Sequence, residues 1–191
     1  MAIPGWVNLD IAALPGVDVV ADIERCAEAG LPFAADAFDG FLMSHVVEHI
    51  RNVLPLMTEL HRIARPGASL MIRVPFGGSD DAWEDPTHVR PYFLNSFGYF
   101  SQPFYWRADY GYRGDWQPER ITLRIAAALV DGLTPQAVME KVQTGRNVVR
   151  EMVAELVAVK PVRAADAALQ RAPRYIIDRI APPATSPGSP G

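Results

Sequence analysis

Two short segments of the chain concentrate side chains that can do chemistry. In the first, His45-Val-Val-Glu-His49, two histidines flank a glutamate at the spacing H-x-x-E-H. On a helix, that spacing lets both imidazoles bind zinc while the glutamate serves as a base, as in one class of zinc peptidase. Residues 40–45 form an apolar run that favours a strand instead, so the two histidines need not share a helical face. A zinc hydrolase using His45, Glu48 and His49 is one hypothesis for this chain.

The second segment runs from Asp85 to Tyr92 and reads DPTHVRPY. It combines a carboxylate, a hydroxyl, an imidazole whose pKa lies near neutrality and a guanidinium, and two prolines stiffen it. Such a set suits a lid that closes over a substrate, with Gly77-Gly78 as its hinge. A structural turn is the alternative, because Asp-Pro commonly opens a turn and Thr87 can cap a short helix.

The elements around these segments predict an α/β fold. Short apolar runs at 6–10, 17–20, 40–45 and 68–75 read as strands, and a helix is expected over about 52–64 because its apolar residues recur at helical spacing. Strand, helix and strand joined by short connections are typical of a parallel sheet. A later strand is expected at 119–130. A helix capped by Thr134 is then expected to continue, with a possible break at Gly145, through Val157 to Pro161.

The aromatic residues gather in a loop-rich insertion at about 76–118, where packing against the sheet is a simpler role for them than lining a pocket. Residues 1–181 are interpreted as one domain, and the Pro/Ser/Gly tail at 182–191 is expected to be disordered.

Composition narrows the classes of function. The chain has 191 residues, 18 basic and 22 acidic, for a net charge of −4, so no basic surplus favours nucleic acid. No apolar run suits a membrane span or a secretory signal. The single cysteine, Cys26, excludes an internal disulfide and a multi-cysteine zinc site, which favours the reduced cytoplasm. The composition leaves the oligomeric state open.

Residues 31–75 carry an ordered set of short motifs. They read Leu31-Pro32-Phe33, Asp36, Phe38-Asp39, His45, Glu48-His49, Glu59-Leu60, Arg62, Arg65-Pro66-Gly67 and Pro75. This set resembles the second half of the cofactor-binding domain in class I S-adenosylmethionine-dependent methyltransferases of the small-molecule type. The resemblance implies a Rossmann-like, mainly parallel sheet with helices on both faces, in which the aromatic insertion follows the fifth family strand.

The resemblance also implies site residues. Asp10 would bind the ribose hydroxyls of S-adenosylmethionine and Asp22 the adenine amino group, with Ile11, Ile23, Ser44 and His45 beside the cofactor. His88, and after it His49, is the candidate general base for a small-molecule acceptor that Asp85 and Arg90 would bind. Many members of the family transfer the methyl group by proximity alone. The type of acceptor atom, oxygen, nitrogen or carbon, stays open.

The chain departs from the family pattern before Asp10. The family places its first strand and a glycine-rich turn there, and only Gly5 occurs among the residues that precede Asp10. We expect a truncated start, with a fragment or a degenerate relative as alternatives. In the last case the chain would be an inactive partner protein. The 191-residue chain is therefore predicted to bind S-adenosylmethionine weakly or not at all, and an amino-terminally extended form to bind it.

Overall fold

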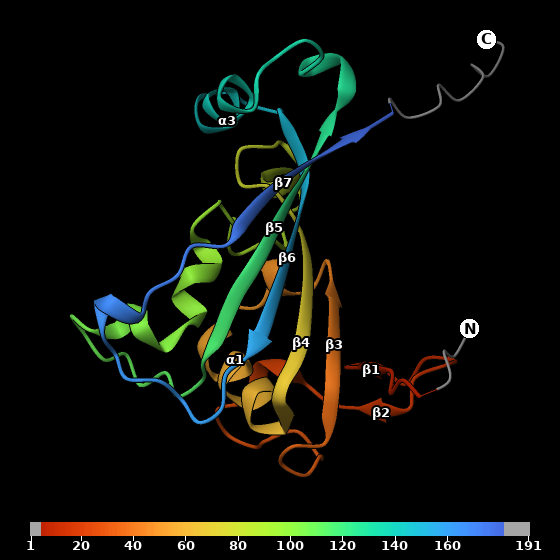
Figure 1. The fold of residues 1–191 in the computed structure, drawn as a ribbon. Coiled ribbons are helices and arrows are strands. Elements are labelled where there is room, and N and C mark those ends of the chain that lie inside the picture. Colours follow the sequence, from red (N-terminus) through yellow and green to blue (C-terminus); the bar gives the residue numbers. More distant parts are fainter. Residues whose placement is uncertain (1–4, 182–191) are drawn as a thin grey trace, which may run out of the picture.

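The computed structural model describes residues 5–181 (Figure 1), so the predicted tail at 182–191 lies outside the described residues. Its main element is a five-stranded sheet in the order β3-β4-β6-β5-β7, and β1 and β2 form a separate two-stranded sheet. The strands are β1 (Leu9–Asp10), β2 (Val19–Val20), β3 (Phe38–Ser44), β4 (Ala64–Pro75), β5 (Trp116–Ala126), β6 (Val149–Ala158) and β7 (Arg174–Ile180).

The helices are short. The α-helices are α1 (Val53–Ile63), α2 (Asp81–Glu84) and α3 (Pro135–Thr144), and the 3-10 helices are η1 (Ile23–Arg25), η2 (Val47–His49), η3 (Ser96–Phe100), η4 (Gln102–Tyr105), η5 (Ala127–Leu129) and η6 (Ala167–Leu169). The predicted helix at 52–64 is confirmed as α1, and Thr134 caps α3 as expected, accepting a hydrogen bond from the Ala137 amide. None of the helices in the described part of the chain has the length and hydropathy to cross a membrane.

One face of the main sheet forms the core. Along β4 the side chains of Leu70, Ile72 and Val74 are fully buried, and their paired neighbours on β6 and β5 are buried on the same face. The side chains between them point to the opposite face, where Arg120 pairs with Glu155 and Arg124 pairs with Glu151. Alternating burial of this kind is expected when only one face of a sheet is covered.

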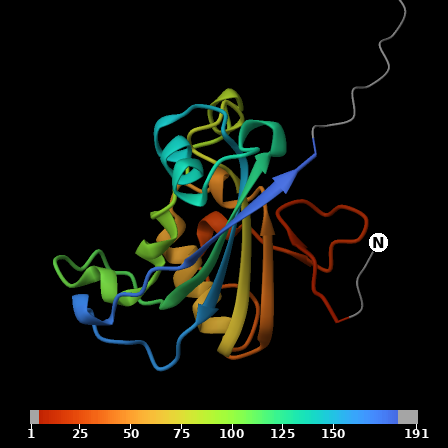
Figure 2. The same cartoon turned by 45° about the horizontal axis from the view of Figure 1, so that its top comes forward.

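The Rossmann-like α/β architecture predicted from the sequence is confirmed, with two differences in detail. First, the sheet is mixed: β3 and β4 are parallel, as are β5 and β7, whereas β6 runs antiparallel to both of its neighbours. Second, helices on both faces are not observed in the described residues. Helix α1 and the insertion lie on one side of β3 and β4, and β1 and β2 lie beyond the β3 edge of the sheet (Figures 1 and 2).

The prediction that the helix beginning at Thr134 continues through Val157 is wrong for its second half. Helix α3 ends at Thr144, before Gly145, and residues 149–158 form β6, which lies between β4 and β5. Met152, Ala154, Leu156 and Ala158 are buried in strict alternation. This period of two, together with the β-branched valines, is the pattern of a strand, but the same residues also fit a helical face over a short window.

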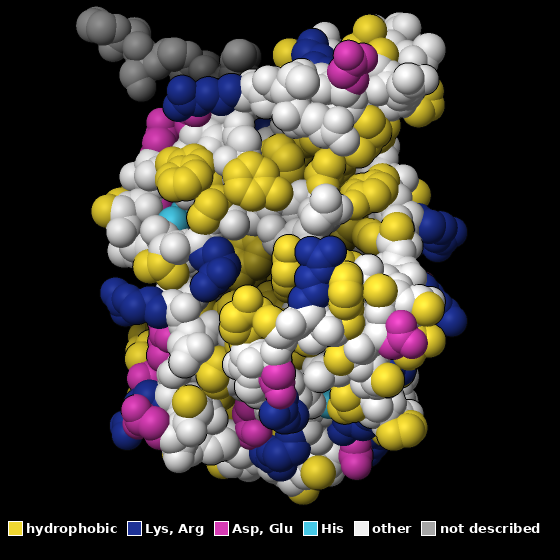
Figure 3. All heavy atoms as spheres, turned by 90° about the vertical axis from the view of Figure 1, so that its left-hand side faces the viewer, with side chains coloured by type: hydrophobic (Ala, Val, Ile, Leu, Met, Phe, Trp, Pro, Cys, Tyr) yellow, Lys and Arg dark blue, Asp and Glu magenta, His cyan; other side chains and the backbone are white. Residues whose placement is uncertain are grey.

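The insertion lies between the end of β4 and the start of β5. Its rings at Tyr92, Phe97, Phe100 and Tyr112 are buried in the core, which agrees with packing as their main role. Others remain exposed, and Figure 3 shows hydrophobic side chains gathered around a hollow on this face. A pocket of about 580 Å³ opens there, lined in part by Phe76, Tyr92, Phe93 and Tyr99.

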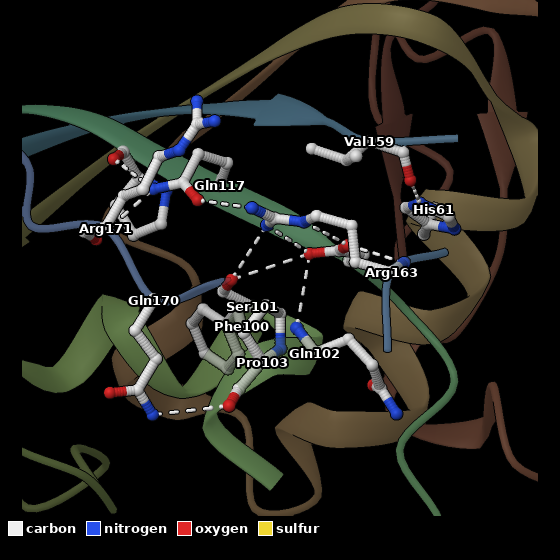
Figure 4. Close-up of polar contacts among 12 residues, drawn as sticks. His61, Phe100, Ser101, Gln102, Pro103, Gln117, Val159, Arg163, Gln170 and Arg171 are labelled. Carbon is white, nitrogen blue, oxygen red and sulfur yellow. Dashed lines mark hydrogen bonds and ion pairs between the residues drawn. The ribbon is translucent and has the colours of Figure 1, made fainter. Parts of the chain in front are cut away.

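A buried ion pair fixes the insertion to the sheet. The Arg163 guanidinium donates two hydrogen bonds to the Asp115 carboxylate, at 2.8 and 2.7 Å, and one more to the Ser101 hydroxyl of the insertion (Figure 4). Asp115 is completely buried. Because the pair joins the insertion, the start of β5 and the segment before β7, it holds three distant parts of the chain together.

Candidate functional site

The carboxyl ends of β1 and β2 carry the two acids predicted to bind the cofactor. The strands are parallel and pair Asp10 with Val20, so Asp22 follows close to Asp10. One oxygen of Asp10 accepts a hydrogen bond from the Ala12 amide, and one oxygen of Asp22 accepts from Glu24 at the start of η1. Among the described residues, the second oxygen of each carboxylate has no hydrogen-bond donor and is free to accept one from a ligand.

The neighbours of these acids differ in exposure. Ile11 is 67% exposed, whereas Ile23 is partly buried against the core. An exposed aliphatic side chain can pack against the face of a planar ring, while the carboxylate beside it accepts a hydrogen bond from the same ligand. The residues at the ends of β1 and β2 therefore fit the nucleoside half of S-adenosylmethionine chemically.

Glu24 connects the end of β2 to the end of β3. Its carboxylate accepts hydrogen bonds from the backbone amides of Arg51, at 2.9 Å, and Asn52, at 3.4 Å. These amides follow η2, which itself follows β3. The ends of β2 and β3 therefore face the same side of the molecule, as expected for strands whose following loops share a ligand site.

Ser44 and His45 lie at the end of β3. Ser44 is the last residue of the strand, and His45 adopts a left-handed backbone conformation with φ of 54°. The His45 ring lies between two carboxylates: Nδ1 is 3.3 Å from Glu48 Oε1, and Nε2 is 3.2 Å from Glu151 Oε1. Asp10 and Ser44 thus both end their strands as predicted, while a crevice shared by the two residues stays a prediction.

Glu151 is a neighbour of this site that the sequence analysis missed. Burial alone would raise the pKa of its carboxyl, but hydrogen bonds from Arg124 and His45 outweigh that effect and lower the pKa. The residue was hidden because its segment was interpreted as a helix. From Met152 to Ala158 every second residue is buried, and all four of these residues are apolar in the sequence, which was the signal that could have placed the segment on a central strand.

The insertion brings the second group of predicted residues to the same end of the sheet. The backbone amide of Val89 donates to the Glu48 carbonyl at 2.8 Å, and the Tyr92 hydroxyl donates to the Val47 carbonyl at 3.3 Å. These bonds fasten residues 85–92 to η2. The rings of His49 and His88 consequently meet edge to face, with centroids 4.7 Å apart.

A chain of hydrogen bonds runs from Asp85 to His49. The Thr87 hydroxyl donates to Asp85 Oδ1 at 2.6 Å and lies 2.9 Å from His49 Nδ1. Hydrogen bonds from the Thr87 side chain and backbone, followed by the nearby histidines, hold the pKa of the Asp85 carboxyl below its ordinary value. The Thr87 backbone amide also donates a hydrogen bond to the Asp85 carboxylate, so the predicted turn is present. The Thr87 hydroxyl in addition links Asp85 to His49.

The structure thus brings together His49, His88 and Asp85 from the predicted catalytic and substrate set. Arg90 is different. Its amide approaches the Glu48 carbonyl, but it lines the 580 Å³ pocket together with Phe76, Tyr92 and Tyr99 rather than the histidine cluster. The zinc-peptidase arrangement, which needs residues 45–49 on one helix, is not observed, because β3 extends to Ser44 and η2 covers only Val47–His49.

Comparisons with known proteins agree with this geometry. The family model described as "Methyltransferase domain" matches residues 8–72. A search of curated proteins finds no significant match. A SAM-dependent methyltransferase from Archaeoglobus fulgidus has a similar structure, with a TM-score of 0.55 and 15% identity over 79% of this chain and 75% of that one. An S-adenosylmethionine-dependent methyltransferase from Mesorhizobium loti gives a TM-score of 0.46 and 14% identity, over 79% of each chain.

The family match covers β1, β2 and β3 and most of β4, and the Archaeoglobus structure supports the fold. In sequence over residues 8–72 and in fold over most of its length, this chain is similar to S-adenosylmethionine-dependent methyltransferases.

Proposed function

We propose that the chain transfers a methyl group from S-adenosylmethionine to a small-molecule acceptor. The observation that carries the proposal is the hydrogen bond that the Arg51 backbone amide donates to the Glu24 carboxylate, which brings the ends of β2 and β3 to one side of the molecule. In this arrangement Asp10 and Asp22 accept hydrogen bonds from the ribose and adenine, beside Ile11, Ile23, Ser44 and His45. When bound, S-adenosylmethionine supplies an electrophilic methyl group.

The acceptor side is proposed at the histidine cluster. The Ala82 carbonyl lies 3.3 Å from His88 Nδ1 and can only accept, so the proton of the neutral ring sits on Nδ1. His88 Nε2 then carries a free lone pair that can take the proton of an acceptor hydroxyl, with His49 as the second candidate base. Asp85 orients the acceptor, and Arg90 would do so from the adjoining pocket. The insertion over residues 77–91 is the proposed lid.

Calorimetric titration with S-adenosylmethionine tests the cofactor half of the proposal. In the amino-terminally extended form, Asp10→Ala removes up to two hydrogen bonds to a charged acceptor, each worth about 1.5–3 kcal/mol, so affinity should fall by at least about tenfold. Asp109→Asn is the matched control, because Asp109 pairs with Arg113 in the insertion and is distant in sequence from β1. Equal affinities in the two variants would remove Asp10 from the site.

The acceptor half is tested by turnover with candidate small molecules. In the amino-terminally extended form, His88→Ala should lower turnover by about 10²–10⁴-fold if the imidazole is the base, and it should leave the affinity for S-adenosylmethionine nearly unchanged. Wild-type turnover in this variant would leave His49, or proximity alone, as the explanation.

A non-catalytic partner protein is the second candidate function. It is favoured by one observation: in the described residues, β1 and β2 are not hydrogen-bonded to the main sheet. Weak cofactor binding by the 191-residue chain together with binding by an amino-terminally extended form would support the enzyme, and no binding by either form would support the partner protein.

A further inference from the structure

Three side chains at the end of β3 and in the insertion have the composition of a metal site. One potential ligand atom from each of Glu48, His49 and His88 lies within 4.8 Å of the other two. Glu48 and His49 come from η2, and His88 comes from the insertion that follows β4. The hydrogen bond from Val89 to the Glu48 carbonyl holds the two segments together, so the cluster is part of the fold.

Glu48 is the unusual member of the cluster. Its side chain is buried, at 2% exposure, and neither carboxylate oxygen has a hydrogen-bond donor among the described residues. His45 Nδ1 approaches one oxygen at 3.3 Å, but without the geometry of a hydrogen bond. Buried polar groups are almost always paired, and a buried carboxylate is costly without a cation or donors. Among the described residues the carboxylate therefore has no hydrogen-bond donor, and only the His45 ring lies at ion-pair distance from it.

The two histidines are prepared as ligands by their hydrogen bonds. The Thr87 hydroxyl gives its only proton to Asp85, so it must accept from His49 Nδ1–H. The Ala82 carbonyl likewise accepts from His88 Nδ1–H. Both neutral rings are thereby held in the tautomer whose Nε2 lone pair is free. Histidines that bind metals typically donate their other ring proton to an oxygen in this way.

We propose that Glu48, His49 and His88 bind a divalent first-row transition-metal ion. Two imidazoles and one carboxylate are the protein ligands of several catalytic zinc and iron sites, and they leave coordination positions open. This set differs from the H-x-x-E-H pattern, because His88 replaces His45 and Glu48 is a ligand rather than a base. His45 remains between Glu48 and Glu151 at the edge of the site.

The ion has a consequence for the acceptor that rests on the proposed methyltransferase function. An open position at the metal would bind an oxygen of the acceptor and lower the pKa of a hydroxyl there, as metals do for bound water, so that the proton could pass to water. The acceptor class is then a hydroxyl-bearing molecule: its oxygen would take the methyl group as the carbon–sulfur bond of S-adenosylmethionine breaks, and S-adenosylhomocysteine would leave. In the metal-bound protein His49 and His88 act as ligands, so their substitution would reduce turnover through loss of the ion.

Metal titration of the full chain tests the site without any need for activity. The protein is first stripped with a chelator and then titrated with Co²⁺, followed by its visible absorption, and with Zn²⁺ by calorimetry. We expect one equivalent to bind, and to raise the thermal midpoint of the wild type. Glu48→Gln and His88→Ala should each weaken binding by at least about tenfold, and Thr87→Val by about 10–100-fold through the lost hydrogen bond to His49.

His61→Gln is the matched control. His61 is also a buried histidine, but its ring binds the Val159 carbonyl and has no place in the cluster, so this variant should bind metal like the wild type. Circular dichroism identifies any variant that fails to fold. If Glu48→Gln fails to fold, His88→Ala in the insertion still tests the site. Absence of binding by the wild type, or unchanged binding in both folded variants, would overturn the site.

The same samples separate this inference from the proposed function. Calorimetry with S-adenosylmethionine reports the cofactor site independently of the metal. Metal binding without cofactor binding, by the 191-residue chain and by the amino-terminally extended form alike, would contradict the methyltransferase proposal and leave the metal site intact. Cofactor binding and methyl transfer that persist unchanged in chelator-stripped protein would contradict the role of the ion toward the acceptor.

Discussion

The residues that carry the family resemblance do two different kinds of work. Arg62 donates to the carbonyls of Leu31, at 3.3 Å, and Phe33, at 2.9 Å, and Glu59 accepts from the Leu31 amide at 2.7 Å. These contacts fasten the Leu31-Pro32-Phe33 segment to α1 and concern stability alone. His45, Glu48 and His49 lie at the end of β3 and belong to the candidate site. The sequence motif alone does not show whether a residue stabilises the fold or belongs to the ligand site, because either role fixes the type of residue at that position.

Glu59→Ala should destabilise the fold without affecting ligands. The substitution leaves the buried Leu31 amide without its acceptor, which should lower the free energy of unfolding by about 1–3 kcal/mol in a urea titration. Glu28→Ala is the control, since Glu28 forms only an exposed ion pair with Arg25. Equal stabilities of the two variants would show that the Glu59 contact contributes nothing.

His61 should make stability depend on pH. Burial, followed by the nearby Lys160, lowers the pKa of its imidazole from the ordinary value of 6.5, although the Val159 carbonyl, Asp115 and Asp36 oppose the shift. The unfolded chain therefore binds a proton at a pH where the folded chain does not. Stability is fully present above the unfolded pKa and falls as the pH drops below it.

The measurement is the free energy of unfolding between about pH 7.5 and pH 5.5. The wild type should lose stability across this range, and His61→Gln should lose less, because it has no imidazole to protonate in the unfolded state. Identical slopes for the two proteins would show that His61 titrates alike in both states.

At the scale of elements, the sequence predicts the first half of the fold better than the second. Strand β4, helix α1 and the start of α3 follow from apolar spacing and from capping residues such as Thr134. The two strands that complete the sheet are different. The apolar residues of β6 fit a helical face over a short window, and β7 was not predicted at all. Strand β7 forms by parallel pairing with β5, which is distant in the sequence, so the residues of β7 alone do not predict it.

The candidate site shows the same limit. The sequence predicts His49, His88 and Asp85 as functional residues because their types suit acid–base chemistry. It does not place His88 against Glu48, since that contact depends on how the insertion folds back onto η2. Glu151 likewise reaches His45 only through the antiparallel pairing of β6 with β4.

The ion pair of Asp115 and Arg163 should be the strongest single link between the insertion and the sheet. Asp115→Ala leaves the Arg163 guanidinium without its carboxylate, and removing one partner of a buried pair typically costs about 3–5 kcal/mol. Urea titration should therefore show a large loss of stability, and proteolysis should begin within the insertion. Asp109→Ala, which breaks an exposed pair in the same insertion, should leave the urea midpoint nearly unchanged. A small effect of Asp115→Ala would mean that aromatic packing alone holds the insertion.

At the scale of the whole molecule, the two edges of the main sheet differ. Strand β7 carries Arg174, Asp178 and Arg179, whereas Asp39, near its start, is the only charged residue in β3. Charged side chains on an edge strand discourage pairing with another chain. Within residues 5–181 no strand pairs with the outer edge of β3, and a groove of about 670 Å³ lies beside it, lined in part by Leu9, Phe41 and Leu42. The edge of β3 is therefore the one more open to a further strand.

We expect the 191-residue chain to self-associate through the β3 edge as its concentration rises. Leu42 is 52% exposed on β3, so Leu42→Lys should leave the fold intact while placing a charge at the edge, and sedimentation velocity should show a shift toward monomer. Ile176→Lys is the matched control, because Ile176 is 42% exposed on the opposite edge strand, β7, and should not alter association. A wild type that stays monomeric at every concentration, or equal shifts in the two variants, would contradict this expectation. Whether the chain self-associates through β3 matters for the cofactor site. Because β3 ends at Ser44, a second chain paired along β3 would lie beside the residues proposed to bind S-adenosylmethionine.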